Sequence, residues 1–227
     1  VAAGPADAPT RALGYTRARM SGTVRTDKDG ALGFLIFDHP ARRNAISAEM
    51  WRQIPGAVEA LAKDDDVRVV ILRGEGETAF VSGADISEFE SNRTAATART
   101  YDDLNHVAFE TVARASKPTV AMIHGICFGG GMALAMSCDL RLASDEAKFR
   151  VPAARLGVGY GYDGTAALVA RLGPALTAEV LFTARIYSAA EALEKGMVHA
   201  LAQPAELDTL VAHYSSMIAD NAPLSIA

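Results

Sequence analysis

Three consecutive glycines, Gly129, Gly130 and Gly131, lie in the uncharged stretch "HGICFGGGMALAMSC". The residues before them are typical of a buried strand, and those after them are typical of a helix. A glycine-rich turn between a strand and a helix presents backbone N–H groups at the positive end of the helix dipole. Such a turn can hold a phosphate or a developing oxyanion, although close packing of the helix on the strand also requires glycine.

A second loop bears on these alternatives. The stretch "AFVSGADI" (79–86) is another strand end followed by small residues, and Asp85 is placed to cap a short helix. Two N–H donors from two separate loops can form an oxyanion hole for an acyl group. The glycine turn does not match the nucleotide-binding patterns G-x-x-x-x-G-K-[ST] and G-x-G-x-x-G, which weakens the phosphate alternative.

The composition is that of an ordinary globular protein. The chain has 227 residues, of which 50% are hydrophobic, and its net charge of −5 argues against a nucleic-acid partner. Cys127 and Cys138 are expected to be buried free thiols in the reducing cytoplasm. Residues 118–138 are uncharged over a length that suits a bilayer, but the central glycines and His124 argue against a membrane span. No pattern of metal ligands is visible.

Predicted strands alternate with predicted helices, which indicates the α/β class. Apolar and β-branched runs predict strands at 31–37, 67–74, 117–123, 140–144 and 197–202. Helices are predicted at 47–64, 97–115, 163–172, 174–184 and 204–220. Another begins at Ser188, which forms a capping box with Glu191. Ser47 is the expected cap of the first helix, and Pro55 is expected to bend or interrupt that helix.

Several motifs, in this order, resemble those of the crotonase (enoyl-CoA hydratase/isomerase) superfamily. They are "HPARRNAIS", "AFVSGADISEF", "KPTVAMIHGICFGGGMALAMSCDLRLAS", "AKFRVPAARLGVGYGYDGTAALVARLG" and "AAEALEKGMVHAL", and the resemblance covers nearly all of residues 30–227. It implies a spiral of ββα units over 23–186, an incomplete C-terminal helical region over 187–227, and packing into trimers or hexamers. Residues 1–22 are expected to be a flexible leader.

The resemblance also implies a site for an acyl-CoA thioester, with CoA entering as part of the substrate and with no separate cofactor or metal. The backbone N–H groups of Ala84 and Gly130 would polarise the thioester carbonyl. The loop Ser82–Ser87 would lie along the adenine and pantetheine, and Arg42 or Arg43 would lie near the phosphates. The implied binding residues are Arg42, Arg43, Ser82, Gly83, Ala84, Asp85, Ile86, Gly129, Gly130, Ala133 and Ala153.

The resemblance breaks at the two positions where hydratases of this superfamily carry glutamates. Here these positions are Ala133 and Ala153. One glutamate would activate water and the other would protonate the α-carbon, and each such group contributes ~10²–10⁴-fold to the rate. Alanine can do neither, so we expect poor hydration of an enoyl-CoA.

Other side chains could transfer a proton instead. His106 matches the position of the catalytic histidine in the aryl-CoA dehalogenase branch, or it belongs to a polar helix face beside Asp102. Asp163 lies near the loop that supplies carboxylates in the dehalogenase and dienoyl-CoA isomerase branches, or it caps a helix. Tyr160 and Tyr162 line the acyl pocket or pack within their loop. Three functions stay open: an acyl-CoA isomerase, hydrolase or decarboxylase, a weak acyl-CoA-binding paralogue, and a scaffold.

Overall fold

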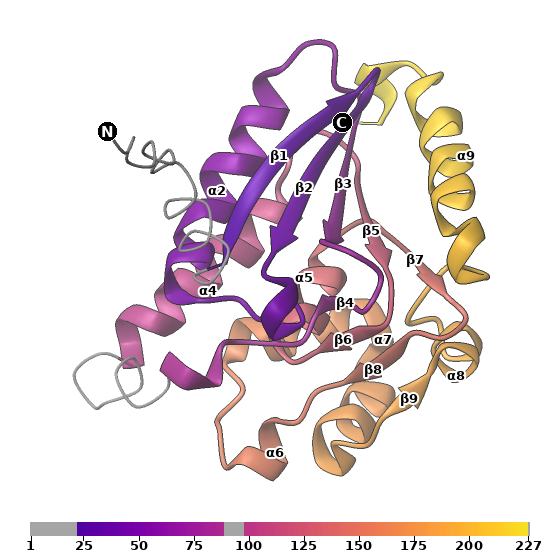
Figure 1. The fold of residues 1–227 in the computed structure, drawn as a ribbon. Coiled ribbons are helices and arrows are strands. Elements are labelled where there is room, and N and C mark those ends of the chain that lie inside the picture. The colour runs from indigo at the N-terminus through magenta and orange to yellow at the C-terminus, as the bar shows by residue number, and fades with distance from the viewer. Residues whose placement is uncertain (1–21, 89–97, 227) are drawn as a thin grey trace, which may run out of the picture.

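The computed structural model describes residues 22–88 and 98–226, which form two β-sheets packed with helices (Figure 1). The large sheet has six strands in the order β1-β2-β3-β5-β7-β10, and the small sheet has four in the order β4-β6-β8-β9. The large sheet consists of β1 (Thr23–Asp29), β2 (Leu32–Asp38), β3 (Val69–Gly74), β5 (Thr119–Ile123), β7 (Leu140–Ser144) and β10 (Ala200–Ala202). The small sheet consists of β4 (Ala79–Val81), β6 (Ile126–Phe128), β8 (Lys148–Arg150) and β9 (Tyr187–Ser188).

The α-helices cover both faces of the large sheet and one end of the small sheet (Figure 1). They are α2 (Ala48–Lys63), α4 (Ala98–Ala113), α5 (Gly130–Ser137), α6 (Ala153–Leu156), α7 (Tyr162–Thr183), α8 (Ala189–Glu194) and α9 (Leu207–Ala219). Short 3-10 turns are η1 (Pro40–Arg42), η2 (Ile86–Glu88), η3 (Pro204–Glu206) and η4 (Pro223–Ser225).

Each repeat of the fold contributes one strand to each sheet and then a helix. Strands β3, β5 and β7 of the large sheet are followed by β4, β6 and β8 of the small sheet, and these lead to α4, α5 and α6–α7. The strands of these repeats pair in parallel, whereas β1 and β9 pair antiparallel at sheet edges. This is the expected spiral of ββα units, and the α/β class is confirmed.

Alternate residues of the central strands face opposite helical layers. Val70 and Leu72 of β3 belong to the main core with residues of α2, α4 and α5. Val69 and Ile71 of the same strand pack on the other face with α9, which contributes Leu207 and Val211. Because both faces are buried, the strand is apolar along its length instead of alternating with polar residues.

Most of the predicted elements are confirmed. Strand β7 occupies 140–144 as predicted, the Ser47 side chain accepts a hydrogen bond from the Met50 N–H at the start of α2, and Ser188 and Glu191 form the predicted capping box. The two helices predicted on either side of residue 173 are the halves of α7, which meet at Gly173 (φ 74°, ψ 165°).

Of the two outcomes expected at Pro55, the interruption is wrong, because α2 runs through that residue from Ala48 to Lys63. A bend there stays a prediction. The buried side chains of Trp51, Ile54 and Val58 anchor the turns before and after the proline in the core, and this packing holds the helix continuous. Strands β1, β6, β8 and β9 were not among the predicted elements, and β4 was expected only as the strand end before the second loop. The leader predicted at 1–22 lies outside the described residues except for Gly22.

Helix α7 carries much of the exposed apolar surface. Phe182 is 82% exposed and Val169 is 37% exposed. Among the described residues, the stretch Gly164–Thr183 is the one helical stretch long and apolar enough, by length and composition, to cross a membrane. The chain turns at Gly173 with Pro174 following, so each half is shorter than the about 20 residues that a bilayer requires. The trimer expected from the sequence stays a prediction.

Both cysteines lie in the core as free thiols, as expected. Burial raises the pKa of the Cys127 and Cys138 thiols above the ordinary range. Next to Cys138, the buried guanidinium of Arg141 donates to the Cys138 carbonyl oxygen at 2.9 Å and to the Met197 carbonyl oxygen at 2.8 Å. Arg141 therefore places a positive charge at the C-terminus of α5, where the helix dipole is negative.

Helix α5 begins in close contact with the backbone of β4. A Cβ atom added to Gly131 would lie 2.3 Å from the Val81 carbonyl oxygen, which is far inside the contact distance. Helix α5 therefore packs directly against β4 only because residue 131 has no side chain.

We predict that Gly131→Ala lowers the free energy of unfolding by about 2 kcal/mol, because the added methyl group must separate α5 from β4. Gly56→Ala is the matched control, since Gly56 lies in α2 with open space around it. That change should raise stability by about 0.5–1 kcal/mol through helix propensity. Urea unfolding of both variants measures the difference, and equal effects at the two positions would contradict the packing argument.

Candidate functional site

Each of the three positions in the turn favours glycine for a different structural reason. Gly129 precedes α5 with φ 53° and ψ −114°, a backbone conformation that favours glycine, and its N–H donates to the Arg150 carbonyl oxygen at 2.8 Å. A Cβ atom added to Gly130 would lie 3.0 Å from the indole ring of Trp51. Gly131 permits the contact with β4. The packing explanation is therefore confirmed at Gly131, Gly130 has no room for a side chain beside Trp51, and the role of the turn in holding an oxyanion stays a prediction.

The second loop is held by hydrogen bonds on both sides of Ala84. The Ile46 N–H donates to the Gly83 carbonyl oxygen and the Asp85 N–H donates to the Ile46 carbonyl oxygen, each at 2.9 Å. These bonds fix the peptide groups around Ala84 while its own N–H takes no part in the pairing. Gly83 has φ 118°, which lets the chain turn at this point.

Asp85 closes this loop as a capping residue. Its Oδ1 accepts hydrogen bonds from the Ser87 N–H at 3.0 Å and from the Ser87 hydroxyl at 2.7 Å, and it pairs with Arg42 Nη1 at 3.3 Å. Burial raises the pKa of the Asp85 carboxyl, but the bonds from Ser87 and the charge of Arg42 outweigh burial and hold the pKa below its ordinary value. The carboxylate is therefore engaged in the loop itself.

The two loops bring together two N–H groups that have no acceptor among the described residues, those of Ala84 and Gly130. A Cβ atom on Gly130 would lie 3.9 Å from the Ala84 nitrogen, so the two residues are neighbours. Gly130 is the first residue of α5, where the helix dipole is positive. Two free donors at such a place can stabilise negative charge on an oxygen atom.

Ala84 and Gly130 both line a first cavity of about 190 Å³. One wall is aromatic, because Trp51 and Phe109 pack edge to face with their ring centroids 5.3 Å apart. The indole N–H of Trp51 donates to the Tyr101 hydroxyl at 3.1 Å and is therefore satisfied. The polar lining residues Asp102, Asn105 and His106 come from α4, the helix that also carries Phe109.

His106, predicted from the sequence, lines this cavity with its side chain 45% exposed. Its Nε2 lies 3.5 Å from Glu110 Oε2, one helical turn farther along α4. Asp102 also lines the cavity one turn before His106, although it was treated only as part of a polar helix face. The i, i+4 spacing of Asp102 and His106 was the signal that could have identified it.

Ala133 and Ala153 lie on two sides of the glycine turn. Ala133 lies in the second turn of α5, is 7% exposed, and lines the first cavity. Ala153 begins α6 and lines another cavity, of about 150 Å³, which also borders Ala84 and Gly130. It is called the third cavity, because a second one lies between α4, α5 and α7. Ser82, Gly83 and Gly129 line that third cavity as well.

The two tyrosines of the "GYGYDG" loop differ. Tyr162, the predicted site residue, is 86% exposed and does not line the first or the third cavity, whereas Tyr160 lines both. Helix α7 has Gly161 as its N-cap, so Asp163 is the second helical residue and not the cap that was the alternative role. Gly161 takes that place because its backbone is extended (φ −62°, ψ 160°). The side chains of Asp163 and Ile86 are outside the described part of the structure.

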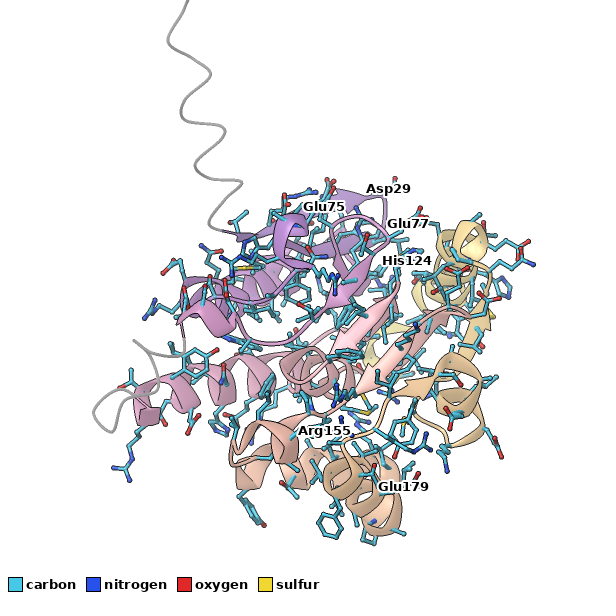
Figure 2. The ribbon with its side chains drawn as sticks, turned by 60° about the horizontal axis from the view of Figure 1, so that its bottom comes forward. Asp29, Glu75, Glu77, His124, Arg155 and Glu179 are labelled. Carbon is cyan, nitrogen blue, oxygen red and sulfur yellow. The ribbon has the colours of Figure 1, made fainter. Side chains whose placement is uncertain are left out.

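The remaining candidates lie at the periphery of the site. Arg42 and Arg43 are exposed after β2, and Arg42 contacts Asp85 of the second loop. His124 is buried at the end of β5, and Figure 2 places it beside Glu77, away from the α6 helix that carries Arg155. Burial lowers the pKa of His124 more than the charge of Glu77 raises it. Among the described residues, no cluster of three or more potential metal ligands is present.

The Tyr160 hydroxyl and the Asn105 Oδ1 are buried without a hydrogen-bond partner in the described part of the chain. The ring of Tyr160 packs against Gly164, where an added Cβ atom would lie 2.8 Å from Cε1. Leaving a buried hydroxyl unpaired costs about 1–3 kcal/mol. Burial also raises the pKa of Tyr160 above its ordinary value of 10.0.

We predict that Tyr160→Phe raises the free energy of unfolding by about 1 kcal/mol at neutral pH, because it removes an unpaired hydroxyl. The folded protein keeps the Tyr160 proton that the unfolded chain loses above about pH 10, so wild-type stability falls as the pH rises through that value. The advantage of Tyr160→Phe should therefore widen above this pH. Urea unfolding across pH measures it, with Tyr162→Phe as the exposed control. Destabilisation at neutral pH would show that the hydroxyl has a partner.

Comparison with known proteins agrees with this fold. The family model for enoyl-CoA hydratase/isomerase matches residues 27–227. The short-chain-enoyl-CoA hydratase of Clostridium acetobutylicum is 33% identical over 203 residues, which cover 89% of this chain and 77% of that protein. The crotonyl-CoA hydratase of Syntrophomonas wolfei is 36% identical over 181 residues, covering 80% of this chain and 69% of that protein.

A solved structure gives the same result. An enoyl-CoA hydratase/carnithine racemase from Magnetospirillum magneticum superposes with a TM-score of 0.87 at 36% identity, covering 92% of this chain and 80% of that chain. The family match extends over residues 27–227, and the superposition covers 92% of the chain. The chain therefore belongs to the enoyl-CoA hydratase/isomerase family and has the crotonase fold.

Proposed function

We propose that this protein binds an acyl-CoA thioester with its carbonyl oxygen between the N–H groups of Ala84 and Gly130. The observation that carries the proposal is that these two N–H groups have no acceptor among the described residues and belong to residues that line the same cavities. When the α-carbon loses a proton, or a nucleophile adds to the carbonyl, negative charge develops on that oxygen. Donors already in place stabilise this charge without reorganisation, and one such donor contributes about 2.7–4 kcal/mol.

The CoA moiety would extend from the third cavity along the loop that begins at Ser82. This cavity is open beside Ser82, Gly83 and Ala84, where an extended pantetheine can approach the backbone. Arg42 and Arg43 are exposed and lie beside this loop, because the Ser82 hydroxyl donates to the Arg42 carbonyl oxygen and the Ser82 N–H donates to the Arg43 carbonyl oxygen, each at 3.1 Å. Their side chains supply positive charge for phosphates. Arg42 is already oriented by its ion pair with Asp85.

The acyl moiety would enter the first cavity, where α4 supplies the groups able to transfer a proton. His106 and Asp102 line this cavity, whereas residues 133 and 153 are alanines. An imidazole can accept a proton from the α-carbon and return it to another position of the acyl group. We therefore propose isomerase, hydrolase or decarboxylase chemistry through an enolate or a tetrahedral oxyanion, with His106 as the proton carrier and Asp163 as the alternative.

A second candidate function is binding of acyl-CoA without efficient turnover. The two alanines favour it, because the proposed site then keeps its N–H donors and lacks the carboxylates that hydration requires. Binding without turnover of a substrate panel would support this candidate. Absence of affinity for CoA and its thioesters would instead indicate a scaffold.

We predict that calorimetry gives a lower Kd for butanoyl-CoA than for free CoA, because only the thioester can accept bonds from both N–H groups. Gly130→Val should remove this difference, since a side chain there meets the Trp51 ring at 3.0 Å and lies 3.9 Å from the Ala84 nitrogen. Gly56→Ala, in open space on α2, should bind as the wild type does. Equal affinities of the wild type for butanoyl-CoA and free CoA would contradict the proposal.

We predict slow hydration of crotonyl-CoA, well below the ~10 s⁻¹ that is ordinary for enzymes. The double change Ala133→Glu and Ala153→Glu should raise kcat by about 10² or more, and each single change should do less because the two carboxylates act together. Ala154→Glu is the matched control, since it adds an exposed carboxylate one residue away in α6. Wild-type hydration at ~10 s⁻¹ would overturn the proposal of a poor hydratase.

Two further variants locate the proton carrier. His106→Gln should lower turnover on whichever isomerase, hydrolase or decarboxylase substrate the wild type accepts, while the Kd for butanoyl-CoA stays within about twofold. Asp163→Asn is the parallel test of the alternative. Unchanged turnover in His106→Gln combined with loss in Asp163→Asn would transfer the role to Asp163.

A further inference from the structure

The segment between β8 and α7, residues 153–161, borders both the first and the third cavity, and we call it the strap. In Figure 1 it lies at the bottom of the view and begins with the short helix α6. Gly159 and Tyr160 line both cavities. The strap residues that line one of the two are Ala153, Leu156, Val158 and Gly161. The strap therefore forms part of the wall of both hollows.

The main chain of the strap is held by local hydrogen bonds. The Arg155 N–H donates to the Pro152 carbonyl oxygen at 2.9 Å, and the Val158 N–H donates to the Ala153 carbonyl oxygen at 3.1 Å. In the described part of the chain, no main-chain hydrogen bond joins residues 153–160 to another helix or strand. Segments whose backbone bonds are local and exposed are the first to open in a native protein.

Gly159 has no structural reason to be glycine in the conformation described. Its φ lies outside the left-handed region, and a Cβ atom added to it would meet no atom within 4 Å. Gly157, in contrast, ends α6 with φ 65°, and Gly161 is the N-cap of α7. What glycine adds at position 159 is main-chain freedom, which matters in a conformation where the strap has moved.

Tyr160 anchors the strap in the core. Its side chain packs against the main core cluster, whereas the Leu156 side chain of the same segment is 58% exposed. The anchor is imperfect, because the Tyr160 hydroxyl is buried without a hydrogen-bond partner in the described part of the chain. Water would satisfy this hydroxyl, so the unpaired group favours withdrawal of the ring from the core.

The ring of Tyr160 occupies a place that depends on Gly164, in the first turn of α7. A Cβ atom added to Gly164 would lie 2.8 Å from Tyr160 Cε1 and 3.4 Å from Cδ1 and Cζ. One added methyl group therefore cannot coexist with the ring in this place.

We propose that the strap is a gate over the first and third cavities and that Tyr160 is its latch. In the closed conformation the ring lies beside Gly164. In the open conformation the ring has left the core, water satisfies the hydroxyl, and the strap has moved away from Ala84 and Gly130. That a thioester enters through the gate rests on the proposed function, whereas the latch does not.

Cleavage by trypsin after Arg155 measures the opening. Arg155 is exposed on α6 (Figure 2), and its bond to Leu156 fits a protease only when the surrounding chain has left the helix. When opening and closing are fast, the cleavage rate follows the population of the open conformation. The rate should depend weakly on urea, because opening of the strap exposes little surface. A rate with the full urea dependence of global unfolding would overturn the gate.

Two variants move the latch in opposite directions. Tyr160→Phe removes the unpaired hydroxyl and should slow cleavage after Arg155 about fivefold, equivalent to ~1 kcal/mol. Gly164→Ala forces the ring out of its place and should speed cleavage about tenfold, although alanine favours a helix more than glycine does. Tyr162→Phe is the matched control, because the Tyr162 side chain is 86% exposed, and it should cleave at the wild-type rate.

Unchanged or faster cleavage in Tyr160→Phe would overturn the latch, and so would slower cleavage in a folded Gly164→Ala. The urea dependence is measured for each variant, so that a change in global stability is distinguished from a change in local opening. If Gly164→Ala does not fold, Tyr160→Phe alone decides.

Butanoyl-CoA separates this proposal from the proposed function. If the closed strap retains the thioester, a concentration of 100 times Kd should slow cleavage after Arg155 about a hundredfold. Binding of butanoyl-CoA without slower cleavage would overturn the gate. Failure of butanoyl-CoA to bind better than free CoA would reject the proposed function, and the two variants of the free protein would still decide whether Tyr160 is a latch.

Discussion

The approach of α5 to β4 is the constraint on which the site depends. The start of the helix meets the backbone of the strand directly, with no side chain between them at Gly131. Because that contact is made by main-chain atoms, it fixes the position of Gly130 relative to the loop that follows β4. The N–H group of Ala84 lies in that loop and is held there by the bonds of Ile46 with Gly83 and Asp85. Two peptide groups from distant parts of the chain thus become neighbours through packing rather than through any side chain of their own.

Charge as well as packing favours this orientation of α5. Its positive end is directed at the cavity through Gly130, and its negative end meets the guanidinium of Arg141, which donates to the carbonyl oxygens of Cys138 and Ala135. Arg141 also binds the Met197 carbonyl oxygen, so it ties the end of α5 to the segment before β10. A buried cation at that place costs desolvation, and its bonds to carbonyl groups offset this cost.

The sequence predicted what local patterns determine. Strand β7, the cap at Ser47 and the capping box at Ser188 depend on neighbours within a few residues, and all were found. The two loops around Ala84 and Gly130 were predicted from the same kind of local pattern, and their role as donors stays a prediction. The three-residue strands of the small sheet were missed, because so short a run has no readable period and forms only by pairing with distant strands. Tertiary contacts also decided that Tyr160 rather than Tyr162 lines the first cavity and that Asp102 lines it as well. No pattern of neighbouring residues reports those contacts.

Burial of the two cysteines determines how this protein reacts with thiols and disulfides, which matters for a protein that handles CoA. Free CoA carries a thiol, and its disulfide can exchange with any protein thiolate that it can reach. Cys127 and Cys138 are fully buried, and burial keeps them protonated by raising the pKa of each thiol. Since exchange requires an accessible thiolate, the folded protein resists mixed-disulfide formation with CoA and resists thiol-directed alkylation. Both cysteines are therefore unreactive because the core buries their sulfur atoms, and they stay unreactive only while the protein is folded.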